Sequence, residues 1–411
     1  MNRRQWLAGC ISLGMLPSLR AAVRNPHWPK FSWGTVPVFA HCGKGDGPFT
    51  DEEASALARF ALVNLEKIQE AKLRKPAFES MRTAALAIKK QKPTTRVAVY
   101  WNTCIEDCAR LHGEGYDEYV ANRHEWQMID KNGKPVRVGN LGLFDMTCPA
   151  VQRWWLERVR KLAQEPAYDG IFLDASGRGH WLISQCGQER ADAFDDSMQY
   201  VLSELRAMTG KFLVFNGLNV KIPHWTDAGT RHLKHTDGMM VEHFLGRSQR
   251  EADGSLRIAD VGKTFDRIRD VSRSGKLILV RSWPRTHAFW GLQPGELSPE
   301  NAARKKAGRP LPADAAPPAD KLRQILKSDL SFCLGCFLIC AGENCYFNYS
   351  WGYGTNGPLA SGNFEWYPEF DRRLGPPKGD FRRTGMSYTR EFAHAAVRVD
   401  LENEQAYIDW G

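Results

Sequence analysis

Eight short apolar segments that alternate with helical segments constrain the fold of this 411-residue chain more than any other feature. Each has the length and composition of a buried strand, and the stretches between them carry helical periodicity. We expect the strands at residues 31–40, 61–65, 96–100, 170–173, 212–215, 238–241, 276–280 and 345–349. Eight strand and helix units in one chain predict an α/β fold, the closed (β/α)8 TIM barrel, rather than an open doubly wound sheet.

The connecting helices have recognisable ends. Thr50 followed by Glu53 has the form of a capping box, and Pro149 stands at the first turn of a helix over residues 151–163. The sequence Asp-Lys-Asn-Gly at 130–133 predicts a tight turn in the long segment 104–148. Further helices are expected over residues 66–90, 190–208, 224–234, 262–273 and 321–340.

Segments outside the strands and helices suggest how the chain is divided. Residues 1–22 have the layout of an export signal, whose Arg3-Arg4 pair resembles a twin-arginine motif, so we expect a periplasmic or secreted protein. The apolar run at 7–19 is too short to span a bilayer, and no other stretch predicts a transmembrane segment. A linker at 23–30 would lead into a barrel over 31–351.

Two additions to the barrel are expected. Residues 284–319, which follow the seventh strand, are rich in Pro, Ala and charge and predict a long insertion loop. Residues 352–411 contain stretches that alternate with period two, which predicts a small β-rich cap at the carboxyl terminus.

Composition narrows the class of partner. The formal net charge is +9, but no Lys/Arg block is long enough to follow a nucleic-acid backbone, so we expect no nucleic-acid partner. The 14 Trp residues suit stacking on sugar rings, although indoles are also ordinary core residues. The glycines at 42–47 match neither the P-loop nor the dinucleotide fingerprint, and no cofactor is expected. The oligomeric state is not specified by the sequence.

The cysteines favour packing over metal binding. Cys333, Cys336 and Cys340 have helical spacing within an apolar segment, which is typical of small buried thiols. No second Cys pair or His has the spacing of a zinc site. Cys104 and Cys108 could form a disulfide only if the local backbone permits it.

Polar side chains gather where the expected strands end. The carboxyl ends of barrel strands form the functional face, and Asp174 and Glu242 each follow a buried strand directly. Taken singly, Asp174 is equally compatible with a helix cap, and Glu242 with a structural ion pair. Glu66 and Asn348 also stand at strand ends. Our candidates for substrate contact are His41, Trp101, Asn102, Asp145, Asn216, His243, Arg281, Trp283 and Trp351.

Two carboxylates on neighbouring strand ends suit glycosidic bond cleavage. One protonates the leaving oxygen, while the other attacks the anomeric carbon or activates water. We assign Asp174 as the nucleophile and Glu242 as the general acid and base. A serine hydrolase is disfavoured because no Gly-x-Ser-x-Gly elbow follows a strand. A metal-dependent hydrolase using His41, Asp174, Glu242 and His243 remains an alternative, although no His-x-His spacing supports a metal site.

Two motifs carry a resemblance to a known group. Residues 143–155, Leu-Phe-Asp-Met-Thr-Cys-Pro-Ala-Val-Gln-Arg-Trp-Trp, and residues 168–174, Tyr-Asp-Gly-Ile-Phe-Leu-Asp, are similar to segments of the glycoside hydrolase-like barrels related to endo-α-1,4-polygalactosaminidase and the α-amylase-like enzymes. A weaker likeness lies at 374–377 and 388–392. The resemblance implies a catalytic carboxylate at Asp174. The α-amylase-like enzymes carry their acid on the fifth strand, where this chain has Asn216, and Glu242 follows the sixth.

Two hypotheses follow. The first is an exported retaining glycoside hydrolase acting on a poly- or oligosaccharide. The second is a non-catalytic carbohydrate-binding barrel that keeps the pocket without the chemistry. The sequence does not specify the sugar, the anomer or endo against exo action.

Overall fold

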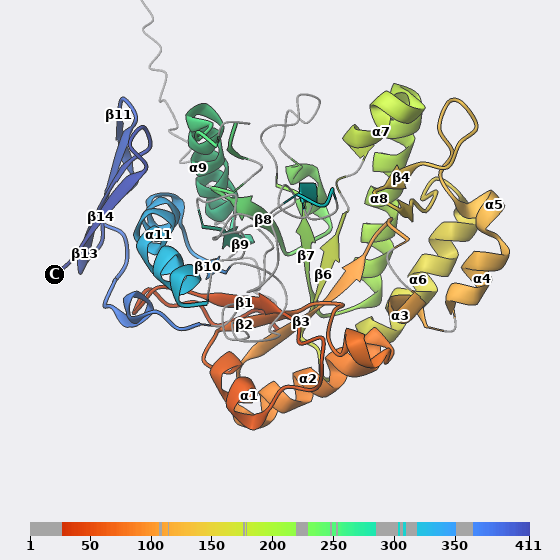
Figure 1. Ribbon diagram of the computed structural model, residues 1–411, viewed down its shortest axis with the longest axis horizontal. Helices are drawn as coiled ribbons and strands as arrows, with labels where there is room; N and C mark the ends of the chain where they lie inside the picture. Colours follow the sequence, from red (N-terminus) through yellow and green to blue (C-terminus); the bar gives the residue numbers. More distant parts are fainter. Residues whose placement is uncertain are drawn as a thin grey trace, which may run out of the picture.

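A computed structural model shows the fold of the chain (Figure 1). It describes residues 27–106, 109–113, 115–175, 177, 179–218, 229–246, 249–251, 254–284, 303–304, 307–309, 319–350 and 365–411. The expected export signal, Cys108, Trp351 and most of the expected insertion loop lie outside these residues.

Eight parallel strands form one sheet in the order β1-β2-β3-β6-β7-β8-β9-β10. A parallel bridge between Val38 and Phe347 connects the two ends of the sheet, so the barrel is nearly closed. The predicted eight-stranded α/β barrel is therefore confirmed. The strands are β1 (Phe39–Cys42), β2 (Leu62–Leu65), β3 (Arg96–Asn102), β6 (Gly170–Asp174), β7 (Phe212–Asn216), β8 (Gly238–Phe244), β9 (Leu277–Ser282) and β10 (Cys345–Tyr349).

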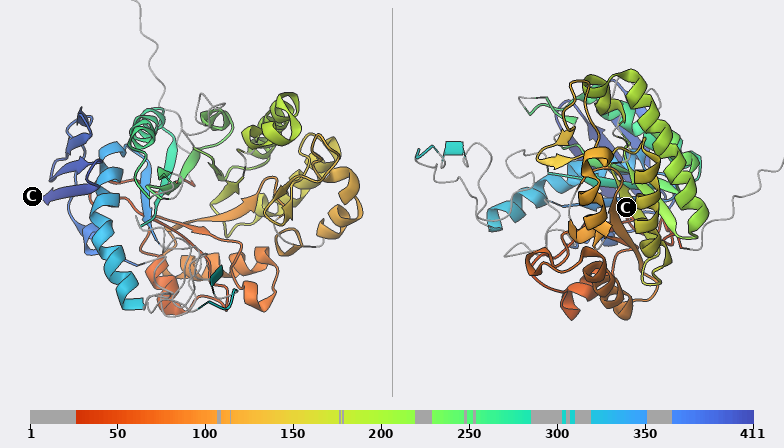
Figure 2. Two further views of the ribbon diagram at one scale, coloured as in Figure 1. Left: turned by 45° about the horizontal axis from the view of Figure 1, so that its top comes forward. Right: turned by 90° about the vertical axis from the view of Figure 1, so that its right-hand side faces the viewer.

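Helices surround the strands on the outside, as the views in Figures 1 and 2 show. They hold their apolar faces against the sheet, and the Thr50 and Glu53 capping box starts the first of them as predicted. These helices include the short α1 (Asp51–Leu57) and the long α2 (Ala77–Gln91), α6 (Pro149–Gln164), α8 (Gln188–Met208), α9 (Ile258–Arg273) and α11 (Ala319–Cys340). None of the described helices is long and apolar enough to cross a membrane.

Two element boundaries differ from the expectation for proline-related reasons. The first strand begins at Phe39 rather than at residue 31, after Pro37, which has no N–H for a sheet hydrogen bond. The helix expected from residue 66 begins at Ala77, with Pro76 as its N-cap, and a short 3-10 turn η1 (Ala71–Leu73) precedes it. A proline at the start of a helix is tolerated, whereas one in its interior breaks it.

The connection between β3 and α6 is built of short elements. It contains α3 (Ala109–His112), α4 (Gly115–Ala121), α5 (Arg123–Trp126), β4 (Arg137–Val138) and β5 (Leu141–Gly142). The predicted tight turn at 130–133 is present, and Gly133 there has a φ of 76° that favours glycine. A shorter helix, α7 (Gly179–Cys186), follows β6, and η2 (Thr230–Lys234) precedes β8.

The carboxyl-terminal residues form the expected small β cap. After the 3-10 turn η6 (Pro368–Asp371), an antiparallel sheet contains β11 (Arg382–Thr384), β12 (Ser387–Glu391), β13 (Ala395–Asp400) and β14 (Gln405–Trp410). Its buried face packs on α11, at the left of Figure 1. The side chains of Cys333, Cys336 and Cys340 are buried on that helix, as predicted.

The start of the described chain is attached to this cap. The Gly375 amide donates to the Trp33 carbonyl at 2.7 Å, and the Leu374 amide donates to that of Gly34 at 3.3 Å. The rings of Trp33 and Phe392 lie 5.8 Å apart. The two ends of the described chain thus meet beside the barrel.

Candidate active site

Asp174 and Glu242 lie on either side of Asn216 at the carboxyl end of the barrel. Asp174 ends β6, Asn216 ends β7 and Glu242 lies near the end of β8, so three neighbouring strands deliver the three side chains. The Asn216 Nδ2 atom donates to Asp174 Oδ1 at 3.0 Å and to Glu242 Oε2 at 2.6 Å. All three residues are half-buried, so solvent still reaches them.

The shared amide limits the separation of the two carboxylates. Because one nitrogen contacts both, the two oxygens lie no more than about 6 Å apart, which is below the roughly 6.5–9.5 Å of inverting glycosidases. Two carboxylates at this distance repel each other when both are ionised. Burial, and next the charge of Glu242, raise the pKa of Asp174 above its ordinary value.

Backbone of unusual conformation follows both acids. Ala175 has a φ of 64° and His243 a φ of 58°, in the left-handed region that residues with a side chain rarely adopt. The pairing of β8 with β9 also shifts register between Val241 and Phe244, so the strand bulges at Glu242. Such strain costs on the order of 1–3 kcal/mol per residue and clusters at functional sites.

Tyr100 orients the other oxygen of Asp174. The phenolic oxygen of Tyr100 accepts hydrogen bonds from Lys67 Nζ at 3.0 Å and from Asn102 Nδ2 at 2.8 Å. Its own proton is therefore directed to Asp174 Oδ2, at 2.7 Å. The Ala175 amide donates to Asp174 Oδ1 at 2.8 Å. Asp174 thus accepts at both oxygens, an arrangement that favours the ionised carboxylate.

A second polar cluster lies on the strands β1, β2 and β9. His41 Nε2 contacts Glu66 Oε1, and Asn64 Nδ2 lies 3.4 Å from His41 Nδ1. Arg281 donates to the His41 carbonyl at 3.4 Å and to Ser350 Oγ at 3.2 Å. All five residues are buried.

Protonation in this cluster follows from its burial and charges. Burial, and next the Arg281 charge, lower the pKa of His41, so the imidazole is neutral and donates to Glu66. Burial alone would raise the pKa of Glu66, but the His41 hydrogen bond and the charges of Lys67 and Arg281 hold it below its ordinary value. A carboxylate and a guanidinium are therefore buried together beside the two acids.

His243 and Trp283 form the remaining wall of this site. The His243 ring lies 5.4 Å from the Trp283 ring, and the Arg281 guanidinium carbon lies 4.9 Å from the same indole. His243 Nε2 is 3.6 Å from Glu242 Oε2. Burial lowers the pKa of His243, so a neutral imidazole stands beside the acid. Among the described residues, no group of three or more His, Cys, Asp or Glu side chains has an arrangement that could hold a metal ion.

The model of hypothetical glycosyl hydrolase family 15 matches residues 89–396 of this chain, which include both acids and six of the eight barrel strands. The chain belongs to hypothetical glycosyl hydrolase family 15. Family membership identifies it as a glycoside hydrolase, as the motifs at 143–155 and 168–174 had indicated. No curated protein matches the sequence.

Solved glycosidases are among the structures similar to this family member. A maltogenic α-amylase from Thermotoga neapolitana is 11% identical, with 89% of this chain and 86% of that chain covered at a TM-score of 0.44. The trehalose-6-phosphate hydrolase of Bacillus licheniformis is 10% identical, with coverages of 90% and 91% and a TM-score of 0.49. An α-galactosidase from Geobacillus stearothermophilus is 10% identical, with coverages of 90% and 48% and a TM-score of 0.45.

Not every predicted site residue of this glycoside hydrolase lies with the acids. Trp101, on β3, is buried against His112 and Trp155, with ring separations of 4.9 and 6.4 Å. It packs in the protein core and has no surface on which a sugar could stack. Asp145 accepts from the Thr147 amide at 3.0 Å in a turn before α6, and it pairs with Arg190 on α8. Trp351 lies outside the described residues.

Two residues of the site were missed by sequence reasoning. Tyr100 is the last apolar residue of the third expected strand, and Lys67 follows Glu66 directly. Both positions were visible as strand ends, but an aromatic there is compatible with core packing and a lysine with a solvated surface. Only the structure shows that they meet over Asp174.

Proposed function

We propose that the protein is an exported retaining glycoside hydrolase in which Asp174 is the nucleophile and Glu242 the general acid and base. The observation that carries this proposal is the pair of half-buried carboxylates held by one Asn216 amide. The upper limit that this amide sets on the distance between the two nearest carboxylate oxygens is compatible with the separation of about 5–5.5 Å in retaining enzymes and is shorter than that of inverting ones.

The environments of the two acids support the division of roles. Asp174 accepts hydrogen bonds at both oxygens, which suits an ionised nucleophile. With Asp174 ionised, the charge repulsion between the two groups favours the proton on Glu242. The raised pKa of Asp174 reflects the cost of its ionisation in a half-buried site, and Tyr100 and Lys67 reduce that cost.

The reaction then proceeds in two steps. An Asp174 oxygen forms a bond to the anomeric carbon, the bond from that carbon to the leaving oxygen breaks, and Glu242 gives its proton to the leaving oxygen. In the second step water attacks the anomeric carbon, Glu242 accepts the water proton, and the bond to Asp174 breaks. Asn216 gives its two amide protons to the two carboxylates and so holds both acids in position.

Substrates with different leaving groups test the two assignments. Against an aryl glycoside of the active sugar, identified with a poly- and oligosaccharide panel, Asp174→Asn should abolish turnover whatever the leaving group. Glu242→Gln should lose most activity on a phenyl glycoside but little of the first step on a dinitrophenyl glycoside, whose departure needs no proton. Proton NMR of the first product should show retained anomeric configuration.

Two results would overturn these assignments. Full turnover by both variants on every substrate that the wild type cleaves would remove the two acids from the mechanism. Glycan binding by the wild type without cleavage of any substrate would favour the non-catalytic carbohydrate-binding barrel.

Export is the second part of the proposal. It is supported by the Arg3-Arg4 pair before the apolar run at 7–19. Replacement of both arginines by lysine should retain the protein in the cytoplasm in a cell fractionation experiment. Unchanged recovery of the double variant outside the cytoplasm would exclude twin-arginine export.

A further inference from the structure

The outer face of the carboxyl-terminal sheet presents one unusually exposed aromatic ring. Tyr407 on β14 is 69% exposed, the largest fraction among the exposed large hydrophobic side chains of the described residues. Its hydroxyl makes no hydrogen bond to any residue that the structure describes. Because β14 alternates in burial, Ala406, Ile408 and Trp410 face inward, and Tyr407 is the aromatic residue of this strand on the outer side.

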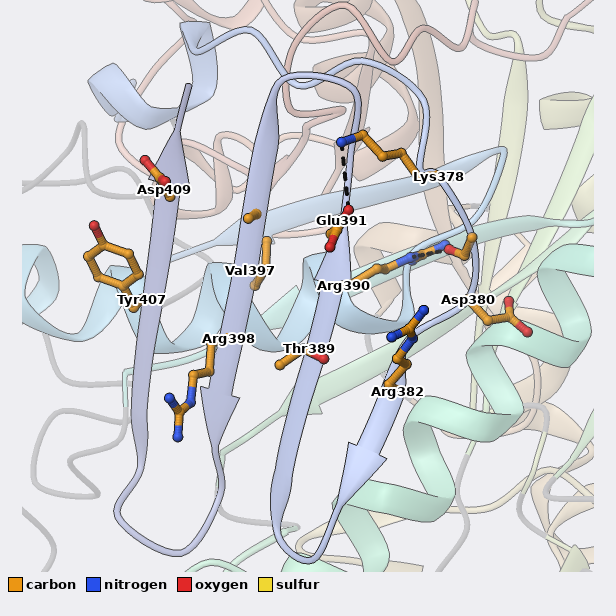
Figure 3. A pocket seen from close by; sticks show the side chains of 12 residues that line it. Lys378, Asp380, Arg382, Thr389, Arg390, Glu391, Val397, Arg398, Tyr407 and Asp409 are labelled. Carbon is orange, nitrogen blue, oxygen red and sulfur yellow. Dashed lines mark hydrogen bonds and ion pairs between the residues drawn. The ribbon is translucent and has the colours of Figure 1, made fainter.

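Strand register places polar side chains in rows beside this ring. Arg398 on β13 pairs with Tyr407, and Thr389 on β12 pairs with Arg398, so the three stand side by side across the sheet. In the next row, Glu391 pairs with Ala396, and Ala396 pairs with Asp409. Figure 3 looks onto these rows. The short Ala396 side chain leaves a depression between the two carboxylates.

Two hollows meet at this place. One, of about 450 Å³, lies over β11 to β14, and a second, of about 600 Å³, lies between β14 and the middle of α11. Tyr407 and Arg398 line both, so the ring stands where one hollow passes into the other. Together they form an elongated groove that suits a chain-like ligand better than a single small molecule.

The groove is held in place from below. Arg390 donates to the Leu338 and Ile339 carbonyls at the end of α11, at 3.1 and 3.0 Å. Arg250 forms a bidentate ion pair with Glu404, with distances of 2.9 and 2.7 Å, which fixes the turn between β13 and β14 to the barrel. A preformed groove loses little conformational entropy when it binds a ligand.

The chemistry of the lining indicates the ligand class. A flat exposed ring stacks on the apolar face of a pyranose, and sugar hydroxyls both donate to carboxylates and accept from guanidinium groups. Opposite charges are balanced on this face, which argues against a strongly anionic or cationic ligand. The outward-pointing cationic side chains are Lys378, Arg382 and Arg398, and the anionic ones are Asp380, Glu391 and Asp409.

We propose that this groove, centred on Tyr407, is a non-catalytic binding site for a neutral glycan chain. The choice of a glycan as the ligand rests on the proposed function of the barrel, whereas the groove is a feature of the structure whatever that function is. The site would hold a polysaccharide on a surface distinct from the barrel mouth and raise its concentration near the enzyme. Short substrates would not use it.

Affinity electrophoresis tests the site without turnover. In an Asp174→Asn background, the protein is run in native gels that contain glycogen, dextran, galactomannan or, for comparison, anionic polygalacturonate. We expect at least one neutral polysaccharide to retard the protein. Tyr407→Ala should weaken that binding about fivefold to tenfold, the loss expected for one stacking platform. Ala396→Trp, which fills the depression on an exposed surface, should do the same.

The matched control is Tyr200→Ala, because Tyr200 is a 49% exposed tyrosine on α8, away from this sheet. It should migrate as the parent does. The proposal is overturned if no neutral polysaccharide retards the parent, if only polygalacturonate does, or if neither Tyr407→Ala nor Ala396→Trp changes migration. In the wild-type background, Tyr407→Ala should leave hydrolysis of a short aryl glycoside unchanged, which separates this site from the proposed reaction.

Discussion

Two polar clusters share the carboxyl end of the barrel but differ in access to solvent. The cluster of Asp174, Asn216 and Glu242 is half-buried and is followed by backbone in the left-handed region. The cluster of His41, Glu66 and Arg281 is buried, and its charges compensate one another. A reacting group must stay accessible and must be able to change its protonation, whereas a buried ion pair does neither at low cost. The first cluster therefore suits the proposed chemistry, and the second suits structural support.

The largest effect should follow from removing the proposed nucleophile. Asp174→Asn should lower kcat/KM at least about 10⁴-fold, or about 5.5 kcal/mol of transition-state stabilisation, with the thermal midpoint close to that of the wild type. Asp145→Asn is the control, because the Asp145 carboxylate contacts Thr147 and Arg190 rather than Tyr100 and Asn216, the partners of Asp174. A similar loss of activity in both variants would contradict the separation of Asp145 from the site.

Breaking the buried cluster should reduce stability. Glu66→Ala leaves His41 and Arg281 without their carboxylate partner and should cost about 3–5 kcal/mol in the free energy of unfolding. Glu157→Ala removes an exposed ion pair with Arg158 and should cost less than about 1 kcal/mol. Urea unfolding measures both. Equal costs would show that burial does not distinguish the two pairs.

A smaller effect is expected at Tyr100, which donates a hydrogen bond to Asp174. Tyr100→Phe removes a hydrogen bond that lowers the pKa of Asp174, so Asp174 should become protonated at a higher pH. The acid limb of kcat/KM should therefore move to higher pH, with a loss of about 10- to 100-fold at the optimum. Tyr168→Phe is the control, because its hydroxyl donates to the Phe78 carbonyl at 2.9 Å. An unchanged acid limb in Tyr100→Phe would contradict the proposed role of Tyr100.

The smallest effect concerns two buried indoles. Trp283 contacts His243 and Arg281, so Trp283→Phe should change KM by about threefold to tenfold through the position of these side chains. Trp101 packs in the core against His112 and Trp155, so Trp101→Phe should lower the thermal midpoint and leave KM unchanged. Steady-state kinetics and calorimetry separate the two outcomes, and a change of KM in Trp101→Phe would return this residue to the site.

Local pattern was enough to predict the barrel and its two strand-end acids. The segments around 170–174 and 238–242 are continuous apolar runs that end in a carboxylate, and such runs become buried parallel strands whatever surrounds them. The expectation that Asp174 and Glu242 lie close together required only the strand order. The resemblance to glycoside hydrolase-like barrels added the reaction class, and the family match confirms it.

What the sequence could not supply is the orientation of side chains. Trp101 and Tyr100 are adjacent and equally aromatic, yet successive side chains of a strand point to opposite faces. Tyr100 therefore meets Asp174, whereas Trp101 enters the core. Asp145 is similar, because the same carboxylate can bind a ligand or close a turn, and its contact with Arg190 joins residues far apart in sequence.

The meeting of Trp33 and Gly34 with Leu374, Gly375 and Phe392 has a consequence for biosynthesis. A ribosome releases residue 33 long before residue 392 exists, so the segment before the first strand must wait for the cap residues before its surroundings are complete. Nascent chains that stop before the cap would leave exposed the face of α11 on which the cap packs. Premature termination within the last forty or so residues should then yield aggregation-prone protein rather than a shortened enzyme.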